Sequence, residues 1–167
     1  MSAGIEGICR EMADYLERRG MVAVTAWPAT PRKAEQAVTV VVSLRGCQVG
    51  PAGFQNYLGE RYDEASGLWQ ERYGKSAKLT FGLDLYAPER ADGQQLQEAF
   101  DTLAGALALG GPEGLCVEDF SCGQTAYDPE SRRLKRPAQA VCSAYLYVVS
   151  RADGQFVDFE LRGVVRA

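Results

Sequence analysis

A run of β-branched residues at Val38–Leu44, with the sequence VTVVVSL, is the feature that most restricts how this chain can fold. Branching at Cβ favours extended backbone, and a nearly continuous apolar run is typical of a central strand covered on both faces. The alternating segment Met21–Trp27 predicts a second strand, and the two prolines of Pro28–Lys33 predict a turn or loop. We expect the two strands to form a hairpin with a long connection.

Two amphipathic helices are predicted, one before these strands and one after the middle of the chain. Residues 2–19 carry apolar residues at the spacing of one helical face, and Gly20 is a natural stop. The second helix begins with Asp92 as its N-cap and extends to about Leu109, before Gly110-Gly111-Pro112. The apolar stripes are Ile5, Ile8, Cys9, Met12 and Leu16 in the first helix, and Leu96, Phe100, Leu103 and Leu107 in the second.

The other regular segments alternate with a period of two, which is typical of strands. A half-buried strand is predicted at Lys75–Ala87, with Leu79, Phe81, Leu83 and Leu85 on one side. Further strands are predicted at Leu115–Phe120, Gln124–Tyr127, Gln139–Ser150 and Phe156–Val165, the last two joined by an Asp153-Gly154 turn. The sequence therefore predicts an α+β fold: a mainly antiparallel sheet with two helices packed on it, in a single domain over residues 1–167.

The stretch Gly46–Gly74 is rich in aromatic residues and shows no sustained period. A short helix near Glu64–Arg72 is one expectation. A segment of this length is unusual in a compact domain unless it packs against something. Two interpretations stay open: it covers the edge of its own sheet, or it is an arm that contacts another subunit, because Tyr and Trp are favoured at interfaces. The candidate contact residues are Phe54, Tyr57, Leu58, Trp69 and Tyr73.

A cluster of basic residues forms a second candidate contact, between a turn and the long strand that follows it. The cluster is Arg132, Arg133, Lys135 and Arg136. It is either a solvated hairpin tip or a docking loop that meets an acidic surface or a phosphate backbone. The segment from Ala91 to Phe120 holds six acidic residues and no basic one, and on a neighbouring copy it could supply that surface.

The composition argues against catalysis and against a metal site. The chain has no histidine, the commonest general base and metal ligand, and its glycines form no phosphate-binding loop. Neighbouring residues of a strand face opposite sides, so Glu118 and Asp119 do not make a catalytic pair. No catalytic residue, metal ligand or cofactor is therefore predicted. The net charge of −4 also disfavours general binding to nucleic acid.

The five cysteines include no CxxC motif, and we expect them to be reduced, small core residues of a cytoplasmic protein. A disulfide between Cys116 and Cys122 is the alternative. The first twenty residues are charged throughout, which argues against a signal peptide. No apolar run reaches the roughly 18 residues that a membrane span needs.

Several blocks of sequence together resemble phage tail terminator proteins, also called tail completion proteins, of prophages and phage-like contractile tails in Gram-positive bacteria. The blocks are FQNYLGE at 54–60, ERYGK at 71–75, TFGLDLYAP at 80–88 and GLCVEDFSCGQTAYD at 114–128. The first helix, the VTVVVSL strand, the GxxL start of the second helix and the basic hairpin follow the same order. The resemblance covers about Ile5 to Leu161.

The resemblance implies a small α+β subunit, without catalytic activity or cofactor, that forms a hexameric ring. Such a ring would cap the head-proximal end of a tail tube, end tube polymerisation and enable head joining. Its partners would be further copies, the tail tube protein, and the sheath or a head–tail connector, with no membrane and no sequence-specific nucleic acid. Assembly would take place in the host cytoplasm, before incorporation into a virion or phage-like particle. The alternatives are another phage structural subunit, at the head–tail joint or the baseplate, or a non-enzymatic protein-binding module.

Overall fold

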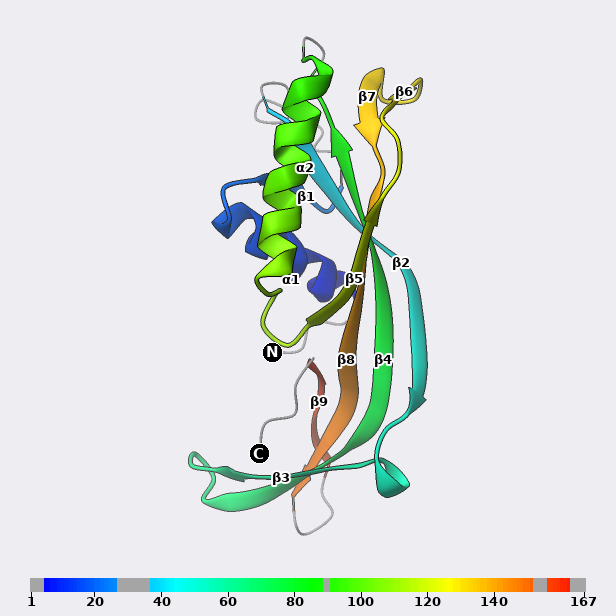
Figure 1. Cartoon of the computed structure of the whole chain (residues 1–167). Coiled ribbons are helices and arrows are strands. Elements are labelled where there is room, and N and C mark those ends of the chain that lie inside the picture. The colour runs from blue at the N-terminus through cyan, green and yellow to red at the C-terminus, as the bar shows by residue number, and fades with distance from the viewer. Residues whose placement is uncertain (1–4, 27–36, 89–90, 152–155, 163–167) are drawn as a thin grey trace.

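The computed structural model describes residues 5–26, 37–88, 91–151 and 156–162. Two helices lie on one face of a long, bent sheet (Figure 1). The helices are α1 (Ile5–Arg18) and α2 (Gly93–Ala108), and a single 3₁₀ turn, η1, spans Phe54–Asn56. The strands are β1 (Val22–Val24), β2 (Thr39–Pro51), β3 (Tyr57–Asp63), β4 (Leu68–Tyr86), β5 (Cys116–Cys122), β6 (Ala126–Asp128), β7 (Arg133–Arg136), β8 (Ala138–Arg151) and β9 (Phe156–Arg162).

All nine strands belong to one sheet, in which β4 is central. It pairs with β2 along one side and with β8 along the other, while β3 and β7 pair with its two ends. The strand β8 also pairs with β5 and β9. Every one of these pairings is antiparallel, so the predicted α+β fold with two helices on a mainly antiparallel sheet is confirmed.

The pairing of β1 with β2 corrects one prediction. The two strands are parallel, with Val22 opposite Thr39 and Val24 opposite Val41, so they do not form the expected hairpin. A parallel pair needs a connection of about a dozen residues or more, and the fourteen residues between Val24 and Thr39 provide it. The predicted turns at Pro28–Lys33 and Asp153-Gly154 lie outside the described residues.

Helix α1 ends as the sequence predicts, at Gly20. The backbone N–H of Met21 donates to the carbonyl of Leu16, and that of Gly20 donates to the carbonyl of Glu17. These two bonds define a Schellman motif, which needs the left-handed φ of +87° found at Gly20. The buried side chains Met12 and Leu16 then pack against the sheet.

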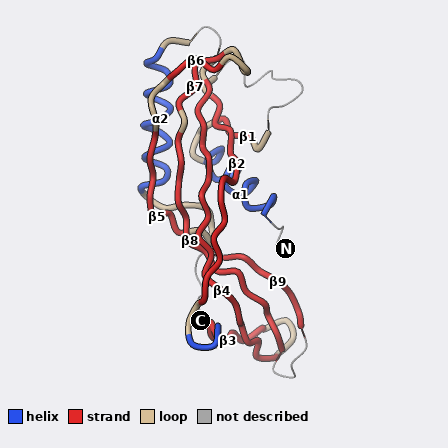
Figure 2. The backbone as a smooth tube through the Cα atoms, turned by 90° about the vertical axis from the view of Figure 1, so that its right-hand side faces the viewer, coloured by secondary structure: helices blue, strands red, loops and turns tan. Residues whose placement is uncertain are grey.

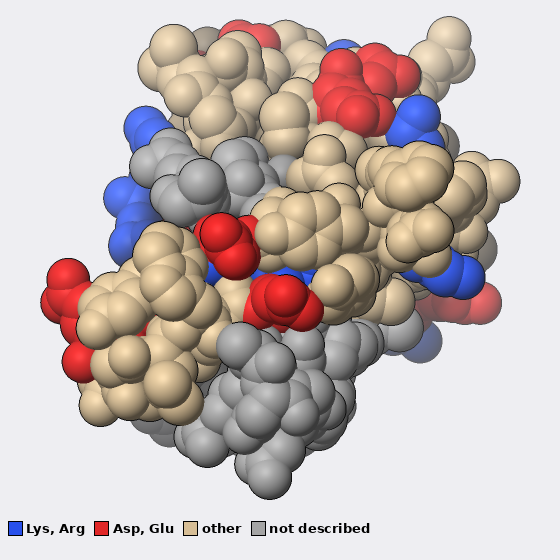
Figure 3. Space-filling model, turned by 90° about the horizontal axis from the view of Figure 1, so that it is seen from below, with Lys and Arg blue, Asp and Glu red and all other residues tan. Residues whose placement is uncertain are grey.

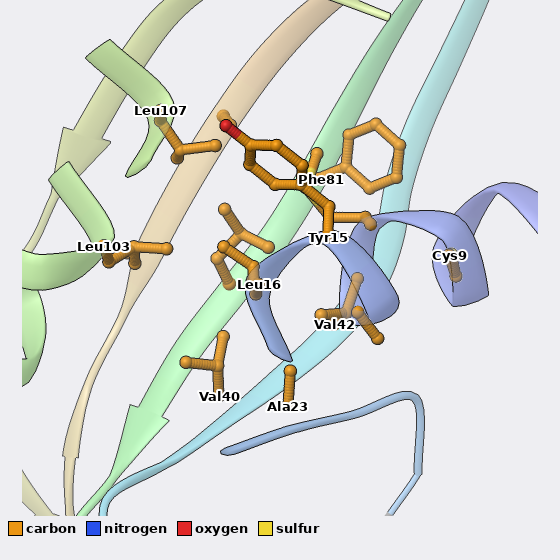
Figure 4. Close-up of a cluster of buried hydrophobic side chains, with 14 of the residues drawn as sticks. Cys9, Tyr15, Leu16, Ala23, Val40, Val42, Phe81, Leu103 and Leu107 are labelled. Carbon is orange, nitrogen blue, oxygen red and sulfur yellow. The ribbon is translucent and has the colours of Figure 1, made fainter. Parts of the chain in front are cut away.

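Helix α2 begins at the predicted N-cap, where the Asp92 carboxylate accepts a hydrogen bond of 3.2 Å from the backbone N–H of Gln95. Its residues Leu96, Leu103 and Leu107 are buried in the core, as predicted. Figure 4 shows the hydroxyl of Tyr15, on α1, pointing toward the end of α2. That hydroxyl donates a 2.6 Å hydrogen bond to the backbone carbonyl of Ala106, so the two helices are joined inside the core.

The predicted alternation of β4 is confirmed, because Leu79, Phe81, Leu83 and Leu85 are all buried beneath the helices. The strand is longer than predicted and, over its last residues, buried on both faces. On the face away from the helices, Asp84 is buried between Arg45 and Lys135, with which it forms ion pairs. The expectation of a half-buried strand is therefore wrong here, because β7 and these long side chains cover its second face.

The strands β4 and β8 continue beyond the helices into a second region, where β3 pairs with β4 and β9 pairs with β8 (Figures 1 and 2). We call this region, residues 54–74, 145–151 and 156–162, the arm. The predicted short helix near Glu64–Arg72 is wrong, because these residues form a turn and the start of β4. Asp63 specifies the turn by accepting hydrogen bonds from the backbone N–H of Ala65 and the hydroxyl of Ser66.

The cysteines differ from expectation in part. Cys9 and Cys142 are buried, but Cys47, Cys116 and Cys122 are exposed, and all five are free thiols. The prediction of five core cysteines is therefore wrong for three, and no disulfide joins Cys116 to Cys122. Cys47 lies in β2 opposite Leu79, beyond an extra residue, Arg45, that shifts the strand relative to β4.

Candidate assembly surface

The arm carries its exposed aromatic side chains on one face. The residues Leu79 and Phe81 of β4 face the helices, and the pairing of β4 with β8 continues without a shift from Gly82 to Gln70. Because side chains alternate along a strand, Tyr73 and Trp69 lie on the continuation of that same face. The helices do not extend this far, and the Trp69 side chain is accordingly 52% exposed. The face of β4 that the helices cover in the core is thus exposed in the arm.

Partners on β3 extend this surface across the strand. The Tyr57 and Tyr73 rings lie 5.3 Å apart between centroids, and the Tyr62 and Trp69 rings lie 5.5 Å apart in an edge-to-face arrangement. Each pair is directly opposite in the ladder, the usual unit of side-chain contact across an antiparallel sheet. Between the two aromatic pairs, Glu60 lies opposite Glu71. We call these six residues the aromatic–glutamate ladder.

The opposite face of the arm has the reverse character. Arg72 is only 3% exposed and Gln70 only 7%. The Gln70 amide connects the Arg61 guanidinium, which donates to it at 3.4 Å, with the Asp63 carboxylate, to which it donates at 3.2 Å. The arm therefore buries polar side chains and exposes aromatic ones. This is the opposite of the pattern that stabilises a lone sheet in water, and it is typical of a surface that another protein covers.

The turn between β2 and β3, where the arm begins, presents Phe54, which is 85% exposed. The backbone there is held in left-handed conformations at Gly53, Gln55 and Asn56. A Cβ at Gly53 would lie 2.8 Å from the carbonyl oxygen of Tyr57, so only glycine fits. Left-handed backbone at non-glycine residues is costly and is often found where a protein makes functional contacts. Leu58, the fifth predicted contact residue, is half-buried at an irregularity of β3.

The predicted basic cluster is distributed over the β6–β7 hairpin, at the end of the molecule opposite the arm (Figure 1). Lys135 lies 3.3 Å from the Asp84 carboxylate. The Arg136 guanidinium donates to the Gln97 amide at 2.6 Å and lies over the Phe100 ring. These two residues therefore bind their own chain.

The other two basic residues of the cluster lie closer to the turn of the β6–β7 hairpin. Arg133 is half-buried, and Arg132 is exposed in the turn with a φ of 57°. The turn is fixed by Asp128, whose carboxylate accepts hydrogen bonds from the backbone N–H and the hydroxyl of Ser131. The bond from the Ser131 hydroxyl is the main cause that lowers the pKa of Asp128. Arg132 is thus the basic residue that this hairpin presents outward.

The acid-only segment is partly engaged within the chain. Asp92 caps α2, and Glu118 lies 3.4 Å from the ammonium group of Lys78. The remaining carboxylates of α2, Glu98 and Asp101, each accept a hydrogen bond from a glutamine one turn earlier. The sequence indicated this segment as a candidate acidic surface for the basic cluster. It did not indicate Glu60, Tyr62 and Glu71, although the spacing of two residues along each strand was a usable signal.

In the part of the chain that the structure describes, no group of three or more Cys, Asp or Glu side chains is placed to hold a metal ion. A search of the described helices for one long and apolar enough to cross a membrane finds none.

Comparison with known proteins finds similarity among solved structures alone. No protein-family model matches the chain, and no curated protein matches it either. Among solved structures, it is similar to the sheath/tube terminator of an extracellular contractile injection system, PVC, in the extended state. The TM-score is 0.46 and the identity 13%, over 100% of this chain and 65% of that one, so this chain spans less than two thirds of that protein's length.

Proposed function

We propose that this chain is a structural subunit of a phage or phage-like tail, formed by a single tail-terminator-like domain over residues 1–167. In this role it caps the head-proximal end of the tail tube as a ring, ends tube polymerisation and enables head joining. The observation that carries the proposal is the arm, which exposes aromatic residues and buries polar ones. A subunit that acts by assembly needs such a surface and needs no catalytic group.

The sequence supports the same role through its resemblance to tail terminator proteins, which includes the blocks at 54–60 and 71–75 in the arm. The partners in this proposal are further copies in a hexameric ring, the tail tube protein, and the sheath or a head–tail connector. The chain is in the host cytoplasm during assembly and then becomes part of the virion or phage-like tail particle. The exposed Phe54 and Trp69 are the first candidates for contacts, because large aromatic residues contribute most of the binding energy at many interfaces.

The test is co-assembly with tail tubes. The purified chain is mixed with tubes assembled from the tail tube protein of the same source, and electron microscopy records whether a ring forms at one end and whether tube growth stops. We expect one cap per tube and arrested growth. Tubes that keep growing at the normal rate with no bound chain would contradict the proposal, and binding at the head–tail joint alone would support the joining-protein alternative instead.

A matched pair of variants tests the part played by the arm. Phe54→Ser and Trp69→Ser remove exposed aromatic side chains and should leave the fold intact while weakening capping by about ten-fold or more. The control is Leu109→Ser, which removes another highly exposed apolar side chain, at the end of α2 and outside the arm. Equal loss of capping in all three would show that the effect does not come from the arm.

A further inference from the structure

The aromatic–glutamate ladder contains a repulsive pair at its centre. Glu60 and Glu71 are directly opposite across β3 and β4, and like charges in that position destabilise a sheet. Among the described residues, the ion pairs are Arg45–Asp84, Lys78–Glu118 and Lys135–Asp84, so none neutralises either glutamate. The hydroxyl of Tyr73 donates to the Glu71 carboxylate at 3.0 Å. This bond holds that carboxylate in place but leaves the charge of the pair uncompensated.

The chemistry around the pair defines what would bind it. Two carboxylates side by side attract a cation, and a guanidinium can contact both because its donors are spread over a plane. The rings of Tyr57 and Tyr73 on one side, and of Tyr62 and Trp69 on the other, can pack on the guanidinium plane and on the aliphatic part of the same side chain. An arginine of a protein partner fits this site better than a bare metal ion, which would leave the aromatic surface exposed.

We propose that the aromatic–glutamate ladder of one copy of this chain binds Arg132 of a second copy. Arg132 is exposed at the tip of the β6–β7 hairpin, and the Asp128–Ser131 hydrogen bonds hold that turn in place. The hairpin and the arm lie at opposite ends of the elongated molecule (Figures 1 and 2). Viewed from the arm end, acidic side chains lie among uncharged ones, with some Lys and Arg side chains between and around them (Figure 3).

A contact between unlike ends is a heterologous contact, which closes into a ring when the rotation between copies permits. The inference rests on the proposed ring and identifies the surfaces that would join its subunits. It also replaces the acidic surface that the sequence indicates, at 91–120, with a different one in the arm.

A charge-swap experiment tests the pairing. Light scattering and sedimentation velocity measure self-association of the wild type and of Glu60→Lys, Arg132→Glu and the variant that carries both. Glu60→Lys places opposite charges across the ladder, so the fold should be at least as stable as the wild type. We expect each single change to weaken association by about ten-fold or more, and the combined variant to recover most of the loss. The control is Glu11→Lys, the same charge change on the exposed face of α1.

Three outcomes would overturn the inference: a wild type that does not self-associate over the accessible concentrations, association that is unchanged in Glu60→Lys, or a combined variant that is no better than the singles. The proposed function has a separate readout, the cap on the tail tube. A ring on the tube that tolerates Glu60→Lys would leave the proposed function and reject this pairing. If the combined variant recovers association but the assembly never caps a tube, the pairing would be supported and the proposed function rejected.

Discussion

Arg45 and Asp84 form an ion pair in which a guanidinium nitrogen lies 2.6 Å from a carboxylate oxygen. Arg45 is the extra residue at which the pairing of β2 with β4 shifts its register. The Asp84 side chain is only 12% exposed, and Lys135 of β7 approaches its second oxygen at 3.3 Å. Burial alone would lower the pKa of Lys135, but a hydrogen bond with Tyr86 and the charge of Asp84 outweigh it and raise that pKa. One buried carboxylate therefore joins three strands.

Replacing this carboxylate should be costly. Asp84→Asn leaves two partly exposed cations without the buried carboxylate that pairs with both, and we expect the free energy of unfolding to fall by about 1–3 kcal/mol. Urea denaturation at neutral pH measures the change. Asp14→Asn, on the exposed face of α1, is the control and should stay within about 0.5 kcal/mol of the wild type. Equal stability of the two variants would show that the ion pair contributes nothing.

Gly82 should resist substitution for a related reason. A Cβ at this position would lie 2.6 Å from both Nε of Arg45 and Oγ of Ser43. Gly82→Ala would therefore push the Arg45 side chain away from Asp84, and we expect a loss of about 1–3 kcal/mol.

The matched change is Gly105→Ala, in α2. A Cβ there meets nothing within 4 Å, so this variant should gain about 0.5–1 kcal/mol through helix propensity. Thermal unfolding of the two variants should shift in opposite directions. A Gly82→Ala protein as stable as Gly105→Ala would mean that Arg45 moves aside without cost.

The bond between α1 and α2 gives a third prediction. Tyr15→Phe keeps the buried ring but removes the donor to the Ala106 carbonyl, which should lower the free energy of unfolding by about 1–2 kcal/mol. Chemical denaturation, followed by circular dichroism, gives the value. Tyr127→Phe removes a hydroxyl from an exposed tyrosine and should change nothing measurable. No difference between the two variants would contradict a stabilising role for the buried bond.

The thiols should separate into two classes of reactivity. Burial raises the pKa of the Cys142 thiol to about 12, so almost none of it is thiolate at pH 8, and the group is also inaccessible. Brief treatment of the folded protein with iodoacetamide, followed by mass spectrometry, should modify Cys47, Cys116 and Cys122 and spare Cys142. Labelling in denaturant should modify all of them. Rapid labelling of Cys142 in the folded state would mean that β8 opens readily.

Local patterns were sufficient for much of the fold. Asp92 and the apolar stripe after it predicted α2 correctly, because a helix cap and a helical period depend on residues close in sequence. The alternation from Leu79 to Leu85 likewise predicted β4. Strand direction has no such signal, since the alternation of Met21–Trp27 is the same in a parallel and an antiparallel pair. This is why the β1–β2 hairpin was predicted wrongly.

The two missed strands show the limit of hydrophobic patterning. In β3 the glycine at position 59 and the irregularity near Leu58 interrupt the period, and the buried face of the arm is polar. In β7 the basic residues resemble a solvated tip, yet Lys135 and Arg136 are held by Asp84 and Gln97, which are distant in sequence. Composition alone indicated aromatic contacts in the arm. That Glu60 lies opposite Glu71 could not be predicted without knowing the register of β3 and β4.

The continuity of β4 and β8 from the core into the arm has a mechanical consequence. No loop interrupts these strands where the helices end, so a pull on the arm acts along strands that are bonded side by side over their whole paired length. A force along these strands loads the hydrogen bonds between them in shear. The bonds must then break together instead of one after another. A force applied at the arm would therefore be transmitted along these paired strands to the helix-covered core.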